Sequence, residues 1–183
     1  IYLAGRNATN SNIVICFSQT KDPMGNWNVY SVSGNPLNDN SWSDYPAISL
    51  TKDELFITIN LLNPGGSWQT SFKQTVIWQI DKATGYSGAA AMTTNLWSEL
   101  KEGGGYMRNM HPVRGGFDLK SGSQYFLSNR NFAEMSDSIY LLRIDNTIAS
   151  TISSIDIKLI RADKNYFLAP NARQAGGRWF ATN

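Results

Sequence analysis

The sequence predicts an all-β protein made of about three four-stranded blades of a roughly six- to eight-bladed β-propeller. Three apolar strands recur, and they end at Ser18, Asp81 and Asp145, which are 63 and 64 residues apart. Between them lie short β-branched and aromatic runs separated by Gly, Asn, Ser and Pro turns, while helical periodicity is weak. A repeat of this length indicates sheets that radiate about a common axis. A small β-sandwich, the alternative all-β fold, would not explain the repeat.

Composition limits the function classes. The 183 residues are 42% hydrophobic and 12% aromatic, which is typical of a globular domain. Only 16% are charged, and the wealth of turn-forming polar residues is common in extracellular all-β proteins. The net charge of +2 is too small for a phosphate-binding surface. We therefore predict an extracellular or cell-surface location, and no nucleic acid as a partner.

Cysteine and hydropathy patterns exclude other classes. Cys16 is the only cysteine, so an intrachain disulfide is excluded, and no Cys/His pattern has zinc spacing. Because Cys16 lies in an apolar strand, we interpret it as a small buried residue. No run approaches the ~18 apolar residues of a membrane-spanning helix. The chain begins with an apolar strand at Ile1, so we expect a piece of a larger propeller whose remaining blades come from the same chain or another protein.

The first unit, residues 1–43, is predicted to be part of a blade. Its second strand would be Ile1–Gly5 and its third Ile13–Ser18, where apolar residues predominate. Trp27–Val32 alternates in polarity and is predicted to be the outer fourth strand.

The second unit, residues 44–110, begins with two strands joined by the polar turn Thr51–Glu54. Val76–Asp81 is its next strand. The outer strand is harder to locate, because residues 82–91 are rich in Gly and Ala. Residues 89–100 have weak helical periodicity, and we interpret them as a loop insertion.

The third unit, residues 111–170, starts at His111 and repeats the same order of elements. Tyr125–Asn129 and Ile139–Asp145 are its second and third strands. Alternating isoleucines predict a fourth strand at Ile152–Ile160. Residues 171–183 would begin the next blade.

Two motifs resemble those of a known family. The run Asp22-Pro23-Met24-Gly25-Asn26-Trp27-Asn28-Val29-Tyr30 precedes Asp44-Tyr45-Pro46, which opens the second unit. This order is similar to secreted bacterial β-propeller proteins with sialidase-like architecture, in which a "DPTG.W..Y" hairpin comes before a "DYP" strand. The hairpin also resembles the Asp-box of sialidases, with a different spacing of its Asp, Gly and Trp. The resemblance implies the fold and export more than a chemistry.

A candidate ligand-binding site lies where the blades begin. The first strand of a propeller blade lines the central channel, so the residues at its start converge from distant parts of the sequence. We expect a non-catalytic binding or scaffold module, with a glycan as one candidate partner. The predicted channel-mouth residues are Asp44, Tyr45, Arg108, His111, Arg114 and Arg173.

The alternative function is that of a sialidase-like, glycan-processing hydrolase. Such an enzyme needs an arginine clamp, a Tyr nucleophile with a Glu base, and an acid. Arginines at blade starts also commonly bind carbonyls of the adjacent blade, so we assign no catalytic residues. The candidates for the enzymatic roles are Arg108, Arg114 and Arg173 for the clamp, Tyr106 or Tyr45 with Glu99 or Glu102, and Asp44 as the acid.

No metal site or cofactor is predicted. The run from Asn35 to Asp44 supplies oxygen atoms that suit calcium, but it lacks the spaced carboxylates, central Gly and closing Glu of an EF-hand loop. Calcium is therefore kept only as an alternative at this loop.

Overall fold

The computed structural model describes residues 2–4, 10–119, 121–130, 133–150 and 152–168. Within these ranges it contains thirteen β-strands and one five-residue helix. The all-β prediction is therefore confirmed. No helix in this part of the chain is long and apolar enough to cross a membrane.

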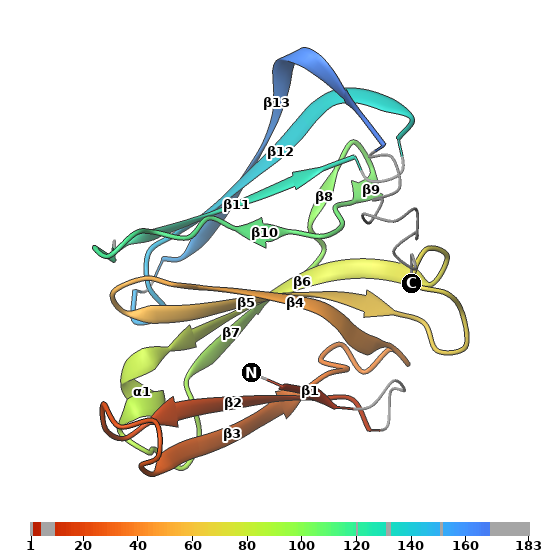
Figure 1. The fold of residues 1–183 in the computed structure, drawn as a ribbon. Helices are drawn as coiled ribbons and strands as arrows, with labels where there is room; N and C mark the ends of the chain where they lie inside the picture. Colours follow the sequence, from red (N-terminus) through yellow and green to blue (C-terminus); the bar gives the residue numbers. More distant parts are fainter. Residues whose placement is uncertain (1, 5–9, 120, 131–132, 151, 169–183) are drawn as a thin grey trace, which may run out of the picture.

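Consecutive strands form three antiparallel sheets, which follow one another in chain order (Figure 1). The short loops between neighbouring strands favour this up-and-down order. A separate hairpin, β8–β9, lies between the second and third sheets in sequence. The elements are β1 (Tyr2–Ala4), β2 (Asn12–Ser18) and β3 (Trp27–Ser33) in the first sheet; β4 (Trp42–Leu50), β5 (Glu54–Leu62), β6 (Phe72–Asp81) and β7 (Thr94–Trp97) in the second; β8 (Lys101–Glu102) and β9 (Gly105–Tyr106); β10 (His111–Pro112), β11 (Ser123–Asn129), β12 (Met135–Asp145) and β13 (Ser154–Phe167) in the third; and the helix α1 (Lys82–Tyr86).

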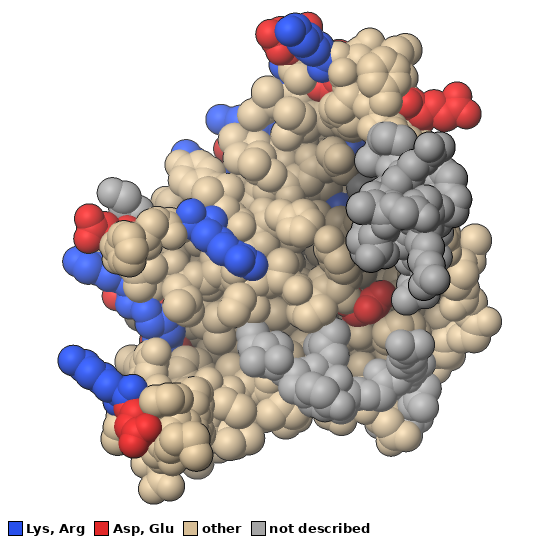
Figure 2. Space-filling model, viewed as in Figure 1, with Lys and Arg blue, Asp and Glu red and all other residues tan. Residues whose placement is uncertain are grey.

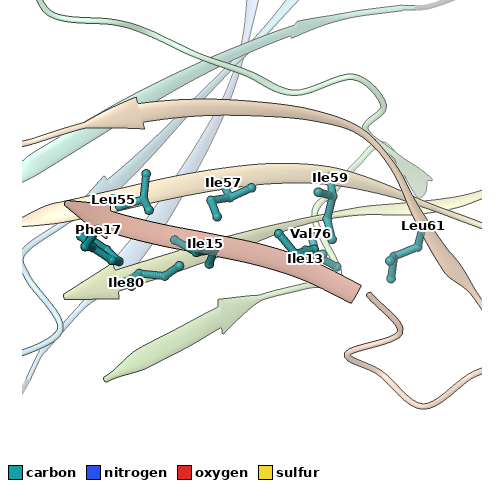
Figure 3. Packing of buried hydrophobic residues seen from close by; sticks show 9 residues of the cluster. All are labelled: Ile13, Ile15, Phe17, Leu55, Ile57, Ile59, Leu61, Val76 and Ile80. Carbon is teal, nitrogen blue, oxygen red and sulfur yellow. The ribbon is translucent and has the colours of Figure 1, made fainter. Parts of the chain in front are cut away.

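The first core lies between the first and second sheets. β2 alternates, so that Ile13, Ile15 and Phe17 face the second sheet. They pack on the odd-numbered residues of β5 and on two residues of β6, as Figure 3 shows. These partners are Leu55, Ile57, Ile59, Leu61, Val76 and Ile80.

The second core lies between the second and third sheets. Phe56 of β5 and Ile77 of β6 face the opposite way from the first core and contact the third sheet. Phe56 meets Phe126 of β11 edge to face, with ring centroids 5.7 Å apart. Every residue of β5 is therefore buried, because each of its two faces packs on a different sheet. The other members of the second core are Leu100, Met107, Met110, Tyr140, Leu142 and Ile144.

The predicted repeat of strands is confirmed. The recurring apolar segments form β2, β6 and β12, and each is the next-to-last strand of its sheet. The predicted fourth strand at Ile152–Ile160 is found in β13. The described residues contain successive sheets of this kind but no closed propeller.

The region after β6 differs from the sequence-based prediction. Residues 89–100 were predicted to be a loop insertion, but they contain β7, the outer strand of the second sheet. The helix lies earlier, where the Asp81 side chain accepts hydrogen bonds from the amides of Ala83 and Thr84. A Cβ on Gly85 would lie 2.4 Å from the Phe17 ring, so only glycine permits this close packing of α1 on β2.

Cys16 is exposed, and the prediction that it is buried was wrong. Its neighbours Ile15 and Phe17 point into the first core. Because side chains alternate along a strand, Cys16 must point away from that core.

Candidate functional site

The first strands of the second and third sheets, β4 and β10, lie next to each other. They bring together several of the predicted channel-mouth residues. Tyr45 and His111 are in direct contact near the start of each strand, and their rings meet edge to face at a centroid distance of 5.7 Å. Asp44 precedes Tyr45 in β4.

A bulge in β4 presents Tyr45. The pairing of β4 with β5 shifts register between Asp44 and Ala47, so Tyr45 and Pro46 fall outside the regular ladder. Tyr45 has φ of 52°, in the left-handed region that costs energy for a residue with a Cβ. Its side chain is 52% exposed. The bulge therefore directs an aromatic ring to the surface beside His111.

The segment before β10 is fixed by the second sheet. The backbone amide of Asn109 donates to Asn60 Oδ1 at 3.2 Å, and Asn60 Nδ2 donates to the Asn109 side-chain oxygen. Thr58 Oγ1 donates to the carbonyl of Met110 at 2.7 Å. Asn109 has φ of 51°. Asparagine enters this region more readily than tyrosine, so Tyr45 is the strained residue of the two, and such outliers often mark functional sites.

A pocket of about 500 Å³ opens beside these residues. Tyr45, Asn109 and His111 line one part of it, and Leu127, Ile139 and Tyr166 of the third sheet line another. The remaining described lining residues are Ser128 and Asn129, so this lining carries no Asp, Glu, Lys or Arg. The pocket combines aromatic rings with neutral hydrogen-bonding groups. Asn109, Asn129 and Tyr166 were not among the predicted site residues.

Arg108 is directed elsewhere. Its guanidinium is nearly buried and donates to the carbonyls of Trp68 and Gln69 in the β5–β6 loop. It also lies 4.8 Å from the centroid of the Phe72 ring. Burial lowers the pKa of Arg108, and the charge of Asp44 acts in the opposite direction. Arg108 thus holds the β5–β6 loop.

Arg114 also binds the main chain. Its Nε donates to the carbonyl of Ile48 in β4 at 3.1 Å, which links the second and third sheets. Arg173, the third predicted arginine, lies outside the described residues. The two arginines that are described therefore bind main-chain carbonyls of other elements. This agrees with the expectation that arginines at blade starts bind carbonyls of the adjacent blade.

A second polar cluster lies at the β8–β9 hairpin. The Tyr106 hydroxyl lies within hydrogen-bond distance of both carboxylate oxygens of Glu99, at 2.8 and 2.9 Å. Lys101 Nζ donates to Glu99 Oε2 at 2.6 Å. These hydrogen bonds, first from Lys101 and then from Tyr106, lower the pKa of Glu99. Of the Tyr and Glu candidates, Tyr106 and Glu99 are thus paired, whereas Tyr45 contacts His111.

The oxygen-rich loop before β4 uses its oxygens internally. Asn35 Oδ1 accepts hydrogen bonds from the amide of Asp39 and from the hydroxyl of Ser41, both at 3.1 Å. The Asp39 carboxylate forms an ion pair with Lys73 at 2.9 Å. Among the described residues, no three His, Cys, Asp or Glu side chains are grouped to hold a metal ion. Calcium binding by this loop gains no support.

The chain was also compared with known proteins. No family model, curated protein or solved structure matches it.

The strain at Tyr45 can be measured by comparing two substitutions. Tyr45→Gly is expected to be more stable than Tyr45→Ala by about 1–2 kcal/mol, because only glycine adopts this φ without a Cβ penalty. Urea unfolding of both variants measures the difference. The same pair at Val29, in the extended strand β3, should give the reverse order, since glycine weakens a strand by about 0.5–1 kcal/mol relative to alanine. Equal stability of the two Tyr45 variants would contradict the strain.

Proposed function

We propose that this chain is part of a β-propeller that serves as a non-catalytic, glycan-binding module of a secreted or cell-surface protein. Three successive antiparallel sheets in chain order, with β4 and β10 adjacent, support the propeller. The composition and the two sequence motifs support export.

Absence of nucleic-acid binding stays a prediction. On the face in Figure 2, the Lys and Arg side chains lie mainly along the left and upper edges, and several of them are beside Asp or Glu.

The pair of Tyr45 and His111 is the observation that carries the binding proposal. The bulge places the Tyr45 ring against His111, both residues line a pocket, and Asn109 and Asn129 line the same pocket. A pyranose ring has an apolar face of C–H groups and a rim of hydroxyls. Aromatic rings suit the first, and amide groups, which both donate and accept hydrogen bonds, suit the second. A lining without Asp, Glu, Lys or Arg favours neutral sugars.

The arginine contacts support a non-catalytic role. A sialidase-like clamp needs several guanidinium groups that converge on one carboxylate. Arg108 instead binds the Trp68 and Gln69 carbonyls, and Arg114 binds the Ile48 carbonyl. These two groups stabilise the protein's own main chain.

A printed panel of neutral and sialylated oligosaccharides tests the binding proposal. We expect the 183-residue chain to bind neutral glycans. Tyr45→Ala and His111→Ala should each weaken the tightest interaction about tenfold, since an aromatic contact of roughly 1.4 kcal/mol is lost. Titration calorimetry with that glycan measures the change.

Phe117→Ala is the control for the glycan experiment. It removes an aromatic side chain that is fully exposed in the loop after β10, so affinity should not change. A panel without any bound neutral glycan, or equal affinities of wild type and Tyr45→Ala, would contradict the proposal.

A sialidase-like hydrolase is the second candidate, and the Tyr106–Glu99 pair favours it. Tyr106 and Arg108 also line one pocket of about 560 Å³. The lowered pKa of Glu99, however, makes it a weaker base. Steady turnover of a fluorogenic sialoside that is abolished by Tyr106→Phe would establish this candidate in place of the binding module.

A further inference from the structure

The orientation of the Asn109 side-chain amide is fixed by its neighbours. Asn60 Oδ1 accepts hydrogen bonds from the backbone amide of Asn109 at 3.2 Å and from the hydroxyl of Thr75 at 2.8 Å. Because a backbone amide can only donate, this atom of Asn60 must be its oxygen, and Asn60 Nδ2 is then the donor to the side-chain oxygen of Asn109. The oxygen of Asn109 is thus engaged. Among the described residues none accepts from Asn109 Nδ2, so this half-buried residue offers a hydrogen-bond donor to a ligand in the pocket.

The side of the pocket formed by the third sheet is apolar. Leu127 is 41% exposed and Ile139 is half-buried. The Tyr166 hydroxyl donates to the carbonyl of Ser138 at 2.5 Å and accepts from the backbone amide of Arg130 at 3.0 Å. Its polar atom is therefore used by the main chain, and the ring is the part of Tyr166 left to contact a ligand. This side of the pocket meets a ligand mainly with hydrocarbon.

Asn129 adds a second amide beside the apolar side chains. It pairs with Ile139 across β11 and β12, so the two side chains are neighbours on one face of the sheet. Asn129 is exposed, and no residue in the part of the chain that the structure describes hydrogen-bonds to its side-chain amide. Its oxygen can therefore accept a hydrogen bond from a ligand.

These three features match the parts of an acetamido group. Such a group has a carbonyl oxygen that accepts, a methyl group that is apolar and an N–H that donates. A sugar hydroxyl at the same position could also accept from Asn109. It would, however, lie against Leu127 and Ile139, where it loses hydrogen bonds to water without gaining others. The lining therefore discriminates between the two substituents.

We propose that the pocket selects neutral glycans that contain an N-acetylhexosamine over glycans built only of plain hexoses. Asn109 Nδ2 donates to the acetamido carbonyl, and Asn129 accepts from the acetamido N–H. The methyl group packs on Leu127 and Ile139, while the Tyr45 ring contacts the sugar ring. This inference rests on the proposed glycan-binding function and adds the class of sugar that the site recognises.

Two disaccharides test the selectivity of the 183-residue chain. N,N′-diacetylchitobiose and cellobiose have the same β1–4-linked backbone and differ only in the acetamido or hydroxyl group at C2. Titration calorimetry measures the affinity of each. We expect diacetylchitobiose to bind at least about tenfold more tightly, because it gains the burial of the methyl group and a hydrogen bond with well-matched partners.

Asn109→Asp tests the hydrogen-bond donor. It replaces Nδ2 by a carboxylate oxygen with little change in shape, and the remaining oxygen can still accept from Asn60. The tenfold preference for diacetylchitobiose should fall to about onefold, because a carboxylate cannot donate to the acetamido carbonyl. The matched control is Asn40→Asp, which makes the same change at an exposed asparagine with φ of 60° in the loop before β4, outside the pocket lining. The control should keep the full preference.

Leu127→Ser tests the apolar side of the pocket independently of Asn109. Because Leu127 is 41% exposed on β11, we expect the variant to fold, with an unchanged circular dichroism spectrum. It should weaken diacetylchitobiose binding severalfold more than cellobiose binding, since only the acetamido ligand loses a methyl contact.

The outcomes separate this inference from the function on which it rests. Neutral-glycan binding on the printed panel without a preference for diacetylchitobiose over cellobiose would overturn the selectivity and leave glycan binding intact. A preference that survives both Asn109→Asp and Leu127→Ser would also overturn it, because the acetamido group would then be recognised elsewhere. A panel without any bound neutral glycan would overturn both proposals together.

Discussion

Phe126→Ala is expected to lower the free energy of unfolding by about 3–5 kcal/mol. The Phe126 side chain is fully buried between the second and third sheets and contacts Phe56 edge to face. Its removal leaves a cavity that two facing sheets cannot easily close, and it also removes the aromatic pair. Because domains are stable by only about 5–15 kcal/mol, this single change brings the protein close to unfolding.

Urea unfolding followed by circular dichroism measures the effect of Phe126→Ala. Phe117→Ala is the matched control, because it deletes the same side chain at a fully exposed position. We expect the control to change stability by no more than about 0.5 kcal/mol. Similar losses in both variants would contradict the packing of β11 against β5.

Glu54→Ala is expected to cost about 2–4 kcal/mol. Glu54 is buried at the start of β5, where Oε1 accepts from the amide of Ile148 at 2.6 Å and Oε2 accepts from Gln79 Nε2 at 2.8 Å. The substitution leaves both donors without this acceptor at a buried position. Each unsatisfied group costs about 1–3 kcal/mol of stability. It also loosens the loop after β12 from the second sheet. Equilibrium unfolding at pH 7 measures the loss, and Glu102→Ala, at a half-buried position in β8, should cost far less.

The same carboxylate gives stability a dependence on pH. Burial raises the pKa of Glu54 above its ordinary value of 4.5, and the hydrogen bonds from Gln79 and Ile148 oppose this only in part. The folded state therefore binds this proton more tightly than the unfolded state. The contribution of Glu54 is largest below pH 4.5 and falls as the pH rises through the folded pKa.

A comparison with Glu54→Gln isolates this contribution. Between pH 4 and 7 the free energy of unfolding of the glutamine variant should rise relative to that of wild type, so that the variant becomes relatively more stable, because glutamine does not titrate. Urea unfolding at several pH values gives the difference. A constant or opposite trend would show that the pKa of Glu54 is not raised.

Strands could be predicted from the sequence because their pattern is local. The alternation in β2 and the apolar runs in β6 and β12 each follow from a few adjacent residues. The helix α1 was missed, because five residues are too short to show helical periodicity and only the Asp81 cap marks the start. The four residues of β7 are all half-buried, so no alternation identified them as a strand.

Part of the site could be predicted as well. The proximity of Tyr45 and His111 follows from their positions at the start of neighbouring sheets. The direction of the arginines does not, because Arg108 is positioned by carbonyls of the β5–β6 loop, 39 and 40 residues away in sequence. The exposure of Cys16 depends on which face of β2 meets the second sheet, and an apolar run does not specify this.

The burial of β5 on both faces has a consequence for the dynamics of the chain. Its odd-numbered residues belong to one core and Phe56 belongs to the other, so the opening of either core would expose one face of this strand to water. Local opening would have to break two interfaces at once, and the amides of β5 should exchange with deuterium only through global unfolding. The β8–β9 hairpin, with two-residue strands and half-exposed side chains, should exchange much earlier.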